Sequence, residues 1–156
     1  MRARPQTLAA ALVAAVVIQG CFLWSSGDTT PAPIKVSIRA SNRLNPDEQG
    51  QSLPTVVKVF QLKNPGKADG ADFEGLYRRE KETLGEDLIQ ADELVIGPGQ
   101  QETKTLARDK AAKALAVVAV VRRPAGTSWR SIVELPAIGT SAELSFVLED
   151  YRIEKK

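Results

Sequence analysis

The apolar run at residues 115–121 reads LAVVAVV, from Leu115 to Val121, without one polar side chain. Intrinsic propensity would also allow a helix over residues 111–119. However, β-branched valines lose side-chain freedom in a helix and pack well on a pleated surface. A short, continuous apolar run is typical of a strand that is buried on both faces. We therefore predict a central strand over residues 115–121, preceded by a turn at residues 108–113.

Outward from this run, the chain alternates between short strand patterns and turns. Residues 34–40 alternate apolar and polar side chains, and residues 56–62 place Val57, Val59 and Gln61 on one face. Further strands are predicted at residues 93–96, 101–106, 129–135 and 142–153, with a turn at residues 97–99. About seven strands at this spacing, without an internal repeat, predict a mainly β fold with two packed sheets, a β-sandwich.

One helical insertion interrupts the strands, at about residues 71–89. Asp72, Phe73, Leu76 and Tyr77 fit one short helix, and residues 80–84 fit another, which Gly85 would end. Farther along, Trp129 is expected to anchor the core of the sandwich; a ligand platform is the alternative.

The N-terminus has the pattern of an export signal. Arg2 and Arg4 precede an apolar run at residues 8–18, which is too short for a membrane span of about 20 residues. The sequence Ile-Gln-Gly-Cys at residues 18–21 resembles a lipobox, so we predict cleavage between Gly20 and Cys21 and lipidation of Cys21. An ordinary signal peptide cut elsewhere and an uncleaved anchor are the alternatives.

These patterns predict three parts of the chain. Residues 1–20 form a signal peptide, residues 21–33 a lipidated N-terminus with a flexible tether rich in Ser, Thr, Gly and Pro, and residues 34–156 the sandwich domain. Twelve tether residues span at most roughly 40 Å. Phe22 and Trp24 could dip into the membrane interface or make no contact with it.

Charge and composition exclude several classes of function. The 21 Lys and Arg residues fall to 19 once Arg2 and Arg4 are removed, which equals the 19 Asp and Glu residues. A neutral mature chain is unlike a nucleic-acid-binding protein. The chain has no histidine, and its single cysteine is assigned to the lipid, so histidine-dependent triads and metal sites are excluded. Nothing in the sequence around the neighbouring carboxylates Glu86 and Asp87 indicates a sugar-binding cleft or a metal partner. We therefore predict no catalytic, cofactor-binding or metal-binding residue.

A long polar loop is predicted at residues 42–54. Loops of this length within compact domains are often functional. Leu44 has no evident partner in the core, and Asp47 and Glu48 could meet a basic patch. A solvated loop without a partner is the alternative.

Four blocks of the sequence, in this order, resemble the outer-membrane lipoprotein family of type VI secretion systems (TssJ, SciN or VasD). They are residues 45–50; residues 57–62 (VKVFQL); Phe73 and Leu76 with residues 84–88 and 98–99; and residues 116–122 with Trp129 and Arg130. One departure is that residues 115–121 lack the aromatic residue that relatives often carry early in this strand.

The resemblance implies a transthyretin-like β-sandwich and a structural role without enzymatic activity. It implies that the protein holds the periplasmic C-terminal region of the inner-membrane protein TssM through the loop at residues 42–53. Carried onto this chain, the contact residues would be Leu44, Asn45, Asp47, Glu48 and Gln49.

The expected location is the periplasmic face of the outer membrane, because Phe22 is not the aspartate that retains some lipoproteins at the inner membrane. The only attached groups expected are the diacylglycerol and the acyl chain on Cys21; no cofactor, nucleic acid or small-molecule substrate is expected. Two other functions stay open: a periplasmic ligand-binding or carrier lipoprotein with a pocket inside the sandwich, and a histidine-free hydrolase.

Overall fold

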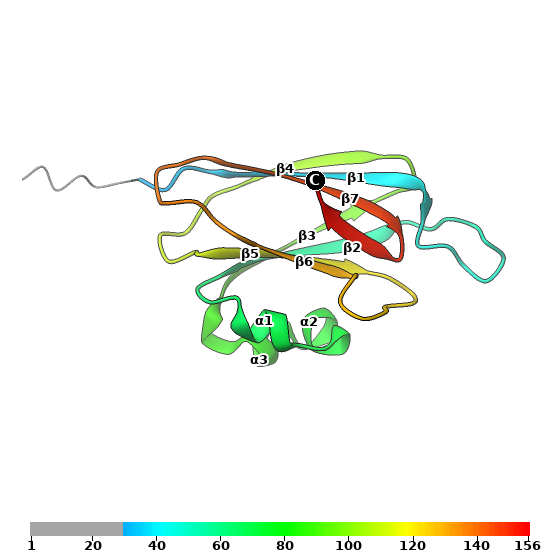
Figure 1. Ribbon diagram of the computed structural model, residues 1–156, viewed down its shortest axis with the longest axis horizontal. Coiled ribbons are helices and arrows are strands. Elements are labelled where there is room, and N and C mark those ends of the chain that lie inside the picture. The colour runs from blue at the N-terminus through cyan, green and yellow to red at the C-terminus, as the bar shows by residue number, and fades with distance from the viewer. Residues whose placement is uncertain (1–29) are drawn as a thin grey trace, which may run out of the picture.

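The computed structural model describes residues 30–156, in which eight strands form two four-stranded sheets (Figure 1). The first sheet has the order β4 (Gln101–Leu106), β1 (Ile34–Leu44), β7 (Ala142–Asp150) and β8 (Arg152–Lys155). The second has the order β3 (Leu88–Ile96), β2 (Thr55–Leu62), β5 (Ala114–Val120) and β6 (Arg130–Glu134). The prediction of a mainly β, transthyretin-like sandwich is confirmed.

The first sheet has one buried and one exposed face. In β1, Ile34, Val36 and Ile38 are fully buried, whereas the residues between them point outward. This strand pairs antiparallel with β4 and parallel with β7, and Ile34 lies beside both Leu106 and Ala142. The alternation that predicted this strand therefore places its apolar side chains against the second sheet.

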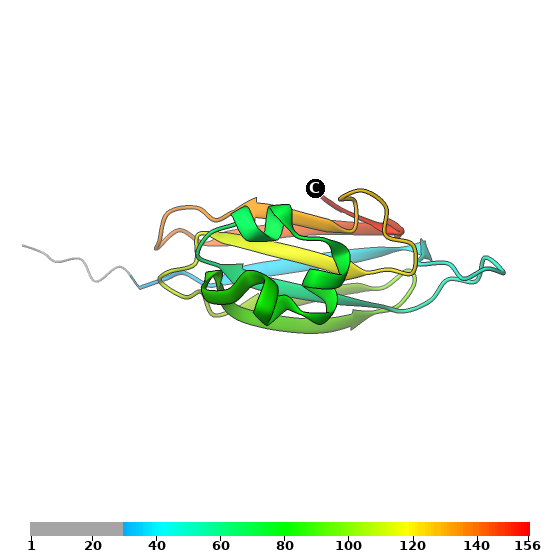
Figure 2. The same cartoon turned by 90° about the horizontal axis from the view of Figure 1, so that it is seen from below.

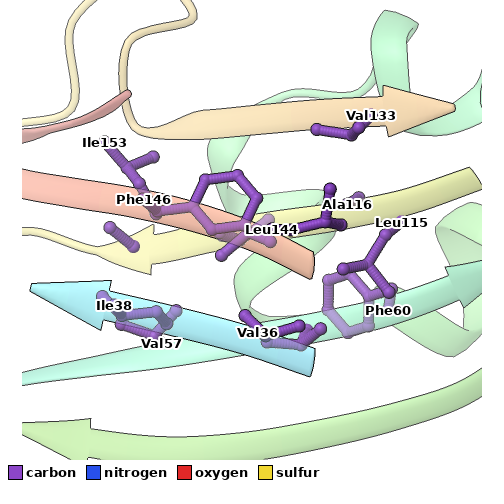
Figure 3. Packing of buried hydrophobic residues seen from close by; sticks show 14 of the residues in the cluster. Val36, Ile38, Val57, Phe60, Leu115, Ala116, Val133, Leu144, Phe146 and Ile153 are labelled. Carbon is purple, nitrogen blue, oxygen red and sulfur yellow. The ribbon is translucent and has the colours of Figure 1, made fainter. Parts of the chain in front are cut away.

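The second sheet is buried on both faces at its centre. Every residue of β5 from Ala114 to Ala119 is buried, which confirms the predicted central strand. In β2, Val57, Val59 and Gln61, which are predicted to share one face, are buried, and so are Lys58 and Phe60 on the opposite face. Between the sheets, side chains such as Ile38 of β1 lie against side chains such as Val57 of β2 (Figure 3).

Three short helices cover the outer face of the second sheet (Figures 1 and 2). They are α1 (Gly66–Gly70), α2 (Phe73–Arg78) and α3 (Glu80–Leu84), followed by the 3-10 helix η1 (Gly85–Asp87). The Asp72 side chain begins α2 by accepting a hydrogen bond of 2.7 Å from the Gly75 N–H. Gly85, with φ of 54°, ends α3 as predicted. Trp129 is 3% exposed and meets Phe73 edge-on, which confirms a core position.

The structure corrects several predicted boundaries. The helical region begins at Gly66, before residue 71, and Leu88 and Ile89 belong to β3. The strand predicted at residues 142–153 is two strands, because Asp150 adopts φ of 51° and turns the chain back. The first strand continues to Leu44 through an irregularity in its pairing with β7, so the loop begins at Asn45.

The two ends of the sandwich carry different connections. The chain enters β1 at Ile34 at one end, and the connection between β1 and β2, residues 45–54, projects from the other end (Figure 1). The strand registers place residues 97–100, 121–129 and 150–151 at the same end as this connection. We call residues 45–54 the β1–β2 loop and this end of the molecule the loop end.

Candidate partner-binding loop

Leu44 lies at the base of the β1–β2 loop and is a core residue. Its side chain is fully buried and belongs to the main hydrophobic cluster. Its carbonyl oxygen accepts a 3.0 Å hydrogen bond from the Leu53 N–H, and its own N–H donates to Ser52 Oγ at 3.3 Å. The expectation that Leu44 has no core partner is therefore wrong, because the strand extends farther than its polar residues Asn42 and Arg43 suggest.

Asn45 and Pro46 fix the base of the loop to two other connections at the loop end. The Asn45 N–H donates to the Asp150 carbonyl at 2.7 Å, and Asn45 Oδ1 accepts from the Arg122 N–H at 2.8 Å. The Tyr151 hydroxyl donates to the Pro46 carbonyl at 2.7 Å. Asn45 is 5% exposed and adopts φ of 45°, a left-handed conformation that asparagine tolerates. Its side chain therefore supports the loop from within.

Asp47 organises the tip. Its Oδ1 accepts hydrogen bonds from the backbone N–H groups of Gln49 at 2.9 Å and Gln51 at 2.8 Å. Its own N–H donates to the Gln51 carbonyl at 2.9 Å, and Gly50, with φ of 81°, completes the turn. A short acidic side chain can hold a turn in this way by bonding backbone groups nearby in sequence. The backbone of the tip is therefore held in one defined conformation by its own hydrogen bonds.

Glu48 and Gln49 are the exposed members of the predicted contact set. Both are exposed, and neither side chain forms a hydrogen bond or an ion pair with the residues that the structure describes. The structure thus divides the five predicted residues into a tip, formed by half-buried Asp47 with exposed Glu48 and Gln49, and a buried base, formed by Leu44 and Asn45. The tip offers carboxylate and amide groups at the extreme end of the molecule, which suits polar recognition of another protein.

Three supporting residues were not anticipated from the sequence. Ser52 Oγ donates to the Asn42 carbonyl at 2.8 Å, Arg122 binds Asn45 through its backbone, and Tyr151 binds Pro46. Arg123 lies over the Tyr151 ring at 5.9 Å. Two of these contacts join segments that are 77 and 105 residues apart in sequence, so no local pattern could have revealed them.

The predicted lipidation site lies elsewhere. Gly20, Cys21, Phe22 and Trp24 fall outside the described residues. Within residues 30–156, none of the helices is long and apolar enough to cross a membrane. Over the same range, no three acidic side chains are grouped so that they could hold a metal ion.

Solved structures similar to this chain come from type VI secretion systems. The T6SS lipoprotein TssJ1 from Pseudomonas aeruginosa is 26% identical, with a TM-score of 0.73 over 81% of this chain and 97% of that chain. Serratia marcescens Lip, described as a membrane-bound component of the type VI secretion system, is 20% identical, with a TM-score of 0.71 over 81% of this chain and 98% of that chain.

A third similar chain comes from a structure described as the T6SS protein TssM C-terminal domain from EAEC. It is 22% identical, with a TM-score of 0.70 over 80% of this chain and 97% of that chain. No curated protein matches the sequence. Residues 32–152 match the family model for the type VI secretion lipoproteins VasD, EvfM and TssJ. The match covers most of the chain, from β1 to the end of β7 and including the β1–β2 loop, and the chain therefore belongs to the type VI secretion lipoprotein family.

Proposed function

We propose that this lipoprotein is anchored in the outer membrane through Cys21 and holds the periplasmic C-terminal region of TssM through the tip of its β1–β2 loop. The observation that carries this proposal is the position of the loop: it projects from the end opposite the one at which the chain enters the sandwich (Figure 1). A lipid at the N-terminus and a partner at the loop would then pull on opposite ends of one rigid body.

The dimensions suit a protein that bridges from a membrane to a partner. The 11 residues of β1 lead from the entry point to the loop end. At about 3.3 Å per residue, this strand separates the two ends by roughly 35 Å. Residues 22–33 would add up to roughly 40 Å between the lipid and the domain. The tip could therefore meet a partner well inside the periplasm.

The sandwich interior favours a structural role over a carrier role. A carrier needs a lined pocket between its sheets, but the space between the two sheets is filled by close-packed apolar side chains. Val36, Ile38, Val57, Leu115 and Phe146 are each 1% exposed or less. We accordingly propose a structural component without enzymatic activity, in keeping with its family.

The test is a loop replacement that leaves the base intact. Residues 47–51 are replaced by Gly-Ser, which retains Asn45, Pro46 and Ser52 and their hydrogen bonds to the rest of the loop end. Loop length has only a weak effect on closure entropy, so the variant should melt close to the parent. Binding to the purified periplasmic C-terminal region of TssM, measured on a biosensor, should fall at least a hundredfold.

A matched control shortens residues 138–141, in the connection between β6 and β7 at the other end of the sandwich, to the same Gly-Ser. This control should bind TssM like the parent. A tip variant that melts and binds like the parent would show that TssM contacts another surface.

A further inference from the structure

β1 carries three cations at intervals of four residues, and within residues 30–156 two of them have a carboxylate partner. Lys35 Nζ lies 3.9 Å from a Glu143 carboxylate oxygen, and Arg43 Nε lies 2.6 Å from Asp150 Oδ1. Arg39, between them, is in register with Val147 of β7 and Gln101 of β4. Among the described residues, its guanidinium has no carboxylate within ion-pair distance. The sheet therefore neutralises the outer two cations and leaves the middle one available.

Arg39 lines two adjoining grooves on the outer face of the first sheet. One, of about 480 Å³, is bordered by Ser41, Asn42 and Gly99. The other, of about 290 Å³, is bordered by Ser37, Gln101, Ser145 and Lys156. Val147 lines both grooves, and none of the described Asp and Glu residues lines either of them. We call the two together the Arg39 groove.

The lining determines which ligand chemistry fits. A guanidinium binds a carboxylate or a phosphate with two parallel hydrogen bonds, and serine, asparagine and glutamine side chains beside it supply further donors. Val147, which is half-buried, gives the groove one apolar wall. The groove thus combines positive charge, neutral hydrogen-bonding groups and a small apolar contact, which suits an acidic, extended peptide.

The position of the groove favours a peptide over a lipid headgroup. Asn42 and Gly99 border the 480 Å³ groove at the loop end, and the Asn42 carbonyl accepts a 2.8 Å hydrogen bond from Ser52 of the β1–β2 loop. Gly99 adopts φ of 71°, which favours glycine, and a Cβ placed there would lie 2.5 Å from Oδ1 of the exposed Asn42 side chain. The chain enters the sandwich, from the side of the proposed lipid, at the opposite end of β1 (Figure 1).

We propose that the Arg39 groove binds an acidic, extended segment of the same protein that contacts the loop tip. This inference rests on the proposed function, because it assigns a second contact to the partner of the loop. The tip would offer the carboxylate of Glu48 to the partner, and the groove would receive a carboxylate from it. Opposite charges at two separated points fix the orientation of a partner and raise its association rate.

The experiment is a biosensor titration of the purified periplasmic C-terminal region of TssM against variants of Arg39. Arg39→Ala should weaken binding about tenfold, and Arg39→Glu more, because it adds repulsion. Arg39→Lys should fall between the parent and Arg39→Ala, since lysine keeps the charge but loses the two-point geometry. Lys35→Ala, on the same strand and face, is the matched control and should bind like the parent. The salt dependence of binding should decrease for Arg39→Ala.

The outcomes separate this inference from the proposed function. If the loop-tip variant loses binding while Arg39→Ala and Arg39→Glu bind like the parent, the groove inference is overturned and the loop proposal stands. If the Arg39 variants lose binding and the tip variant does not, the groove stands and the loop proposal fails. Binding to phosphatidylglycerol vesicles that depends on Arg39, without any effect on TssM, would assign the groove to lipid and overturn the inference. A parent protein that does not bind TssM overturns both.

Discussion

At the scale of single residues, Asn45 shows how a polar residue in a loop can serve the fold. Its backbone turns left-handed, its N–H binds β7, and its side-chain oxygen binds the connection after β5. A sequence pattern reveals that such a residue is polar, but not whether its side chain faces a partner or the protein. The exposed neighbours Glu48 and Gln49 were predicted in the same set, and only the long-range contacts separate them from Asn45.

We predict that Asn45→Ala lowers the free energy of unfolding by about 2–3 kcal/mol. The substitution leaves the Arg122 N–H without its acceptor and forces alanine into a left-handed conformation. Asn45→Gly should cost about 1 kcal/mol less, because glycine adopts this conformation freely. Urea unfolding of the two variants separates the cost of the lost hydrogen bond from the cost of the left-handed backbone conformation.

Gln49→Ala, at the exposed tip, is the control for this series and should change stability by less than about 0.5 kcal/mol. If Asn45→Ala unfolds at the parental urea concentration, Asn45 does not support the loop as described.

At the scale of secondary-structure elements, Lys58 joins the second sheet to the helical layer. It is 7% exposed, and its ammonium group lies 3.3 Å from a carboxylate oxygen of Glu80 in α3 and 3.3 Å from one of Glu93 in β3. It also donates to the Tyr77 carbonyl of α2 at 2.7 Å. A buried ammonium is tolerated only where several acceptors surround it, and here they come from three elements.

We predict that Lys58→Met destabilises the protein by about 2–3 kcal/mol. Methionine fills similar space, but it leaves the Tyr77 carbonyl and the Glu80 carboxylate without their shared donor. The melting temperature should fall by roughly 6–12 °C. Relative to the parent, amide hydrogen exchange should increase more in α2 and α3 than in β5, because the helical layer loses its link to the sheet.

Lys104→Ala is the control for Lys58→Met, since Lys104 pairs with Asp92 at 2.8 Å at a more exposed position. Such surface pairs contribute about 1 kcal/mol or less. Equal melting temperatures for the two variants would contradict the assigned role of Lys58.

Also at the element scale, the sequence predicts strongly patterned elements better than irregular ones. β5 is apolar throughout, and residues 34–40 of β1 alternate regularly between buried and outward side chains, so the sequence predicts both strands and misses only the end of β1 at Leu44. The turn at Asp150 and Tyr151 has no glycine or proline to mark it, so β7 and β8 were predicted as one strand. The short helix α1 has glycine at both ends and no side-chain cap, and such a segment resembles a turn.

At the scale of the whole molecule, the proposed function requires that anchoring and partner binding are separable. The loop end and the entry end lie at opposite ends of the sandwich (Figure 1). Residues 30–156 hold 19 basic and 18 acidic residues, because Arg2, Arg4 and Asp28 precede them. The described body therefore offers almost no net charge that could replace a lipid as a membrane attachment.

We predict that Cys21→Ser releases the protein from the membrane fraction without changing its affinity for TssM. Each buried methylene group contributes about 0.8 kcal/mol to membrane binding, and a single chain holds only marginally, whereas a triacylated cysteine holds firmly. After cell fractionation, the variant should be found in the soluble periplasmic fraction. The purified variant should bind the periplasmic region of TssM like the parent. Secretion by the system should nevertheless be lost, because the partner would then be held by a body with no attachment to the outer membrane.

A serine variant that still sediments with membranes and is processed normally would contradict lipidation at Cys21. A soluble variant that supports full secretion would instead show that the anchor is dispensable, and the role of this protein would then lie in the loop end alone.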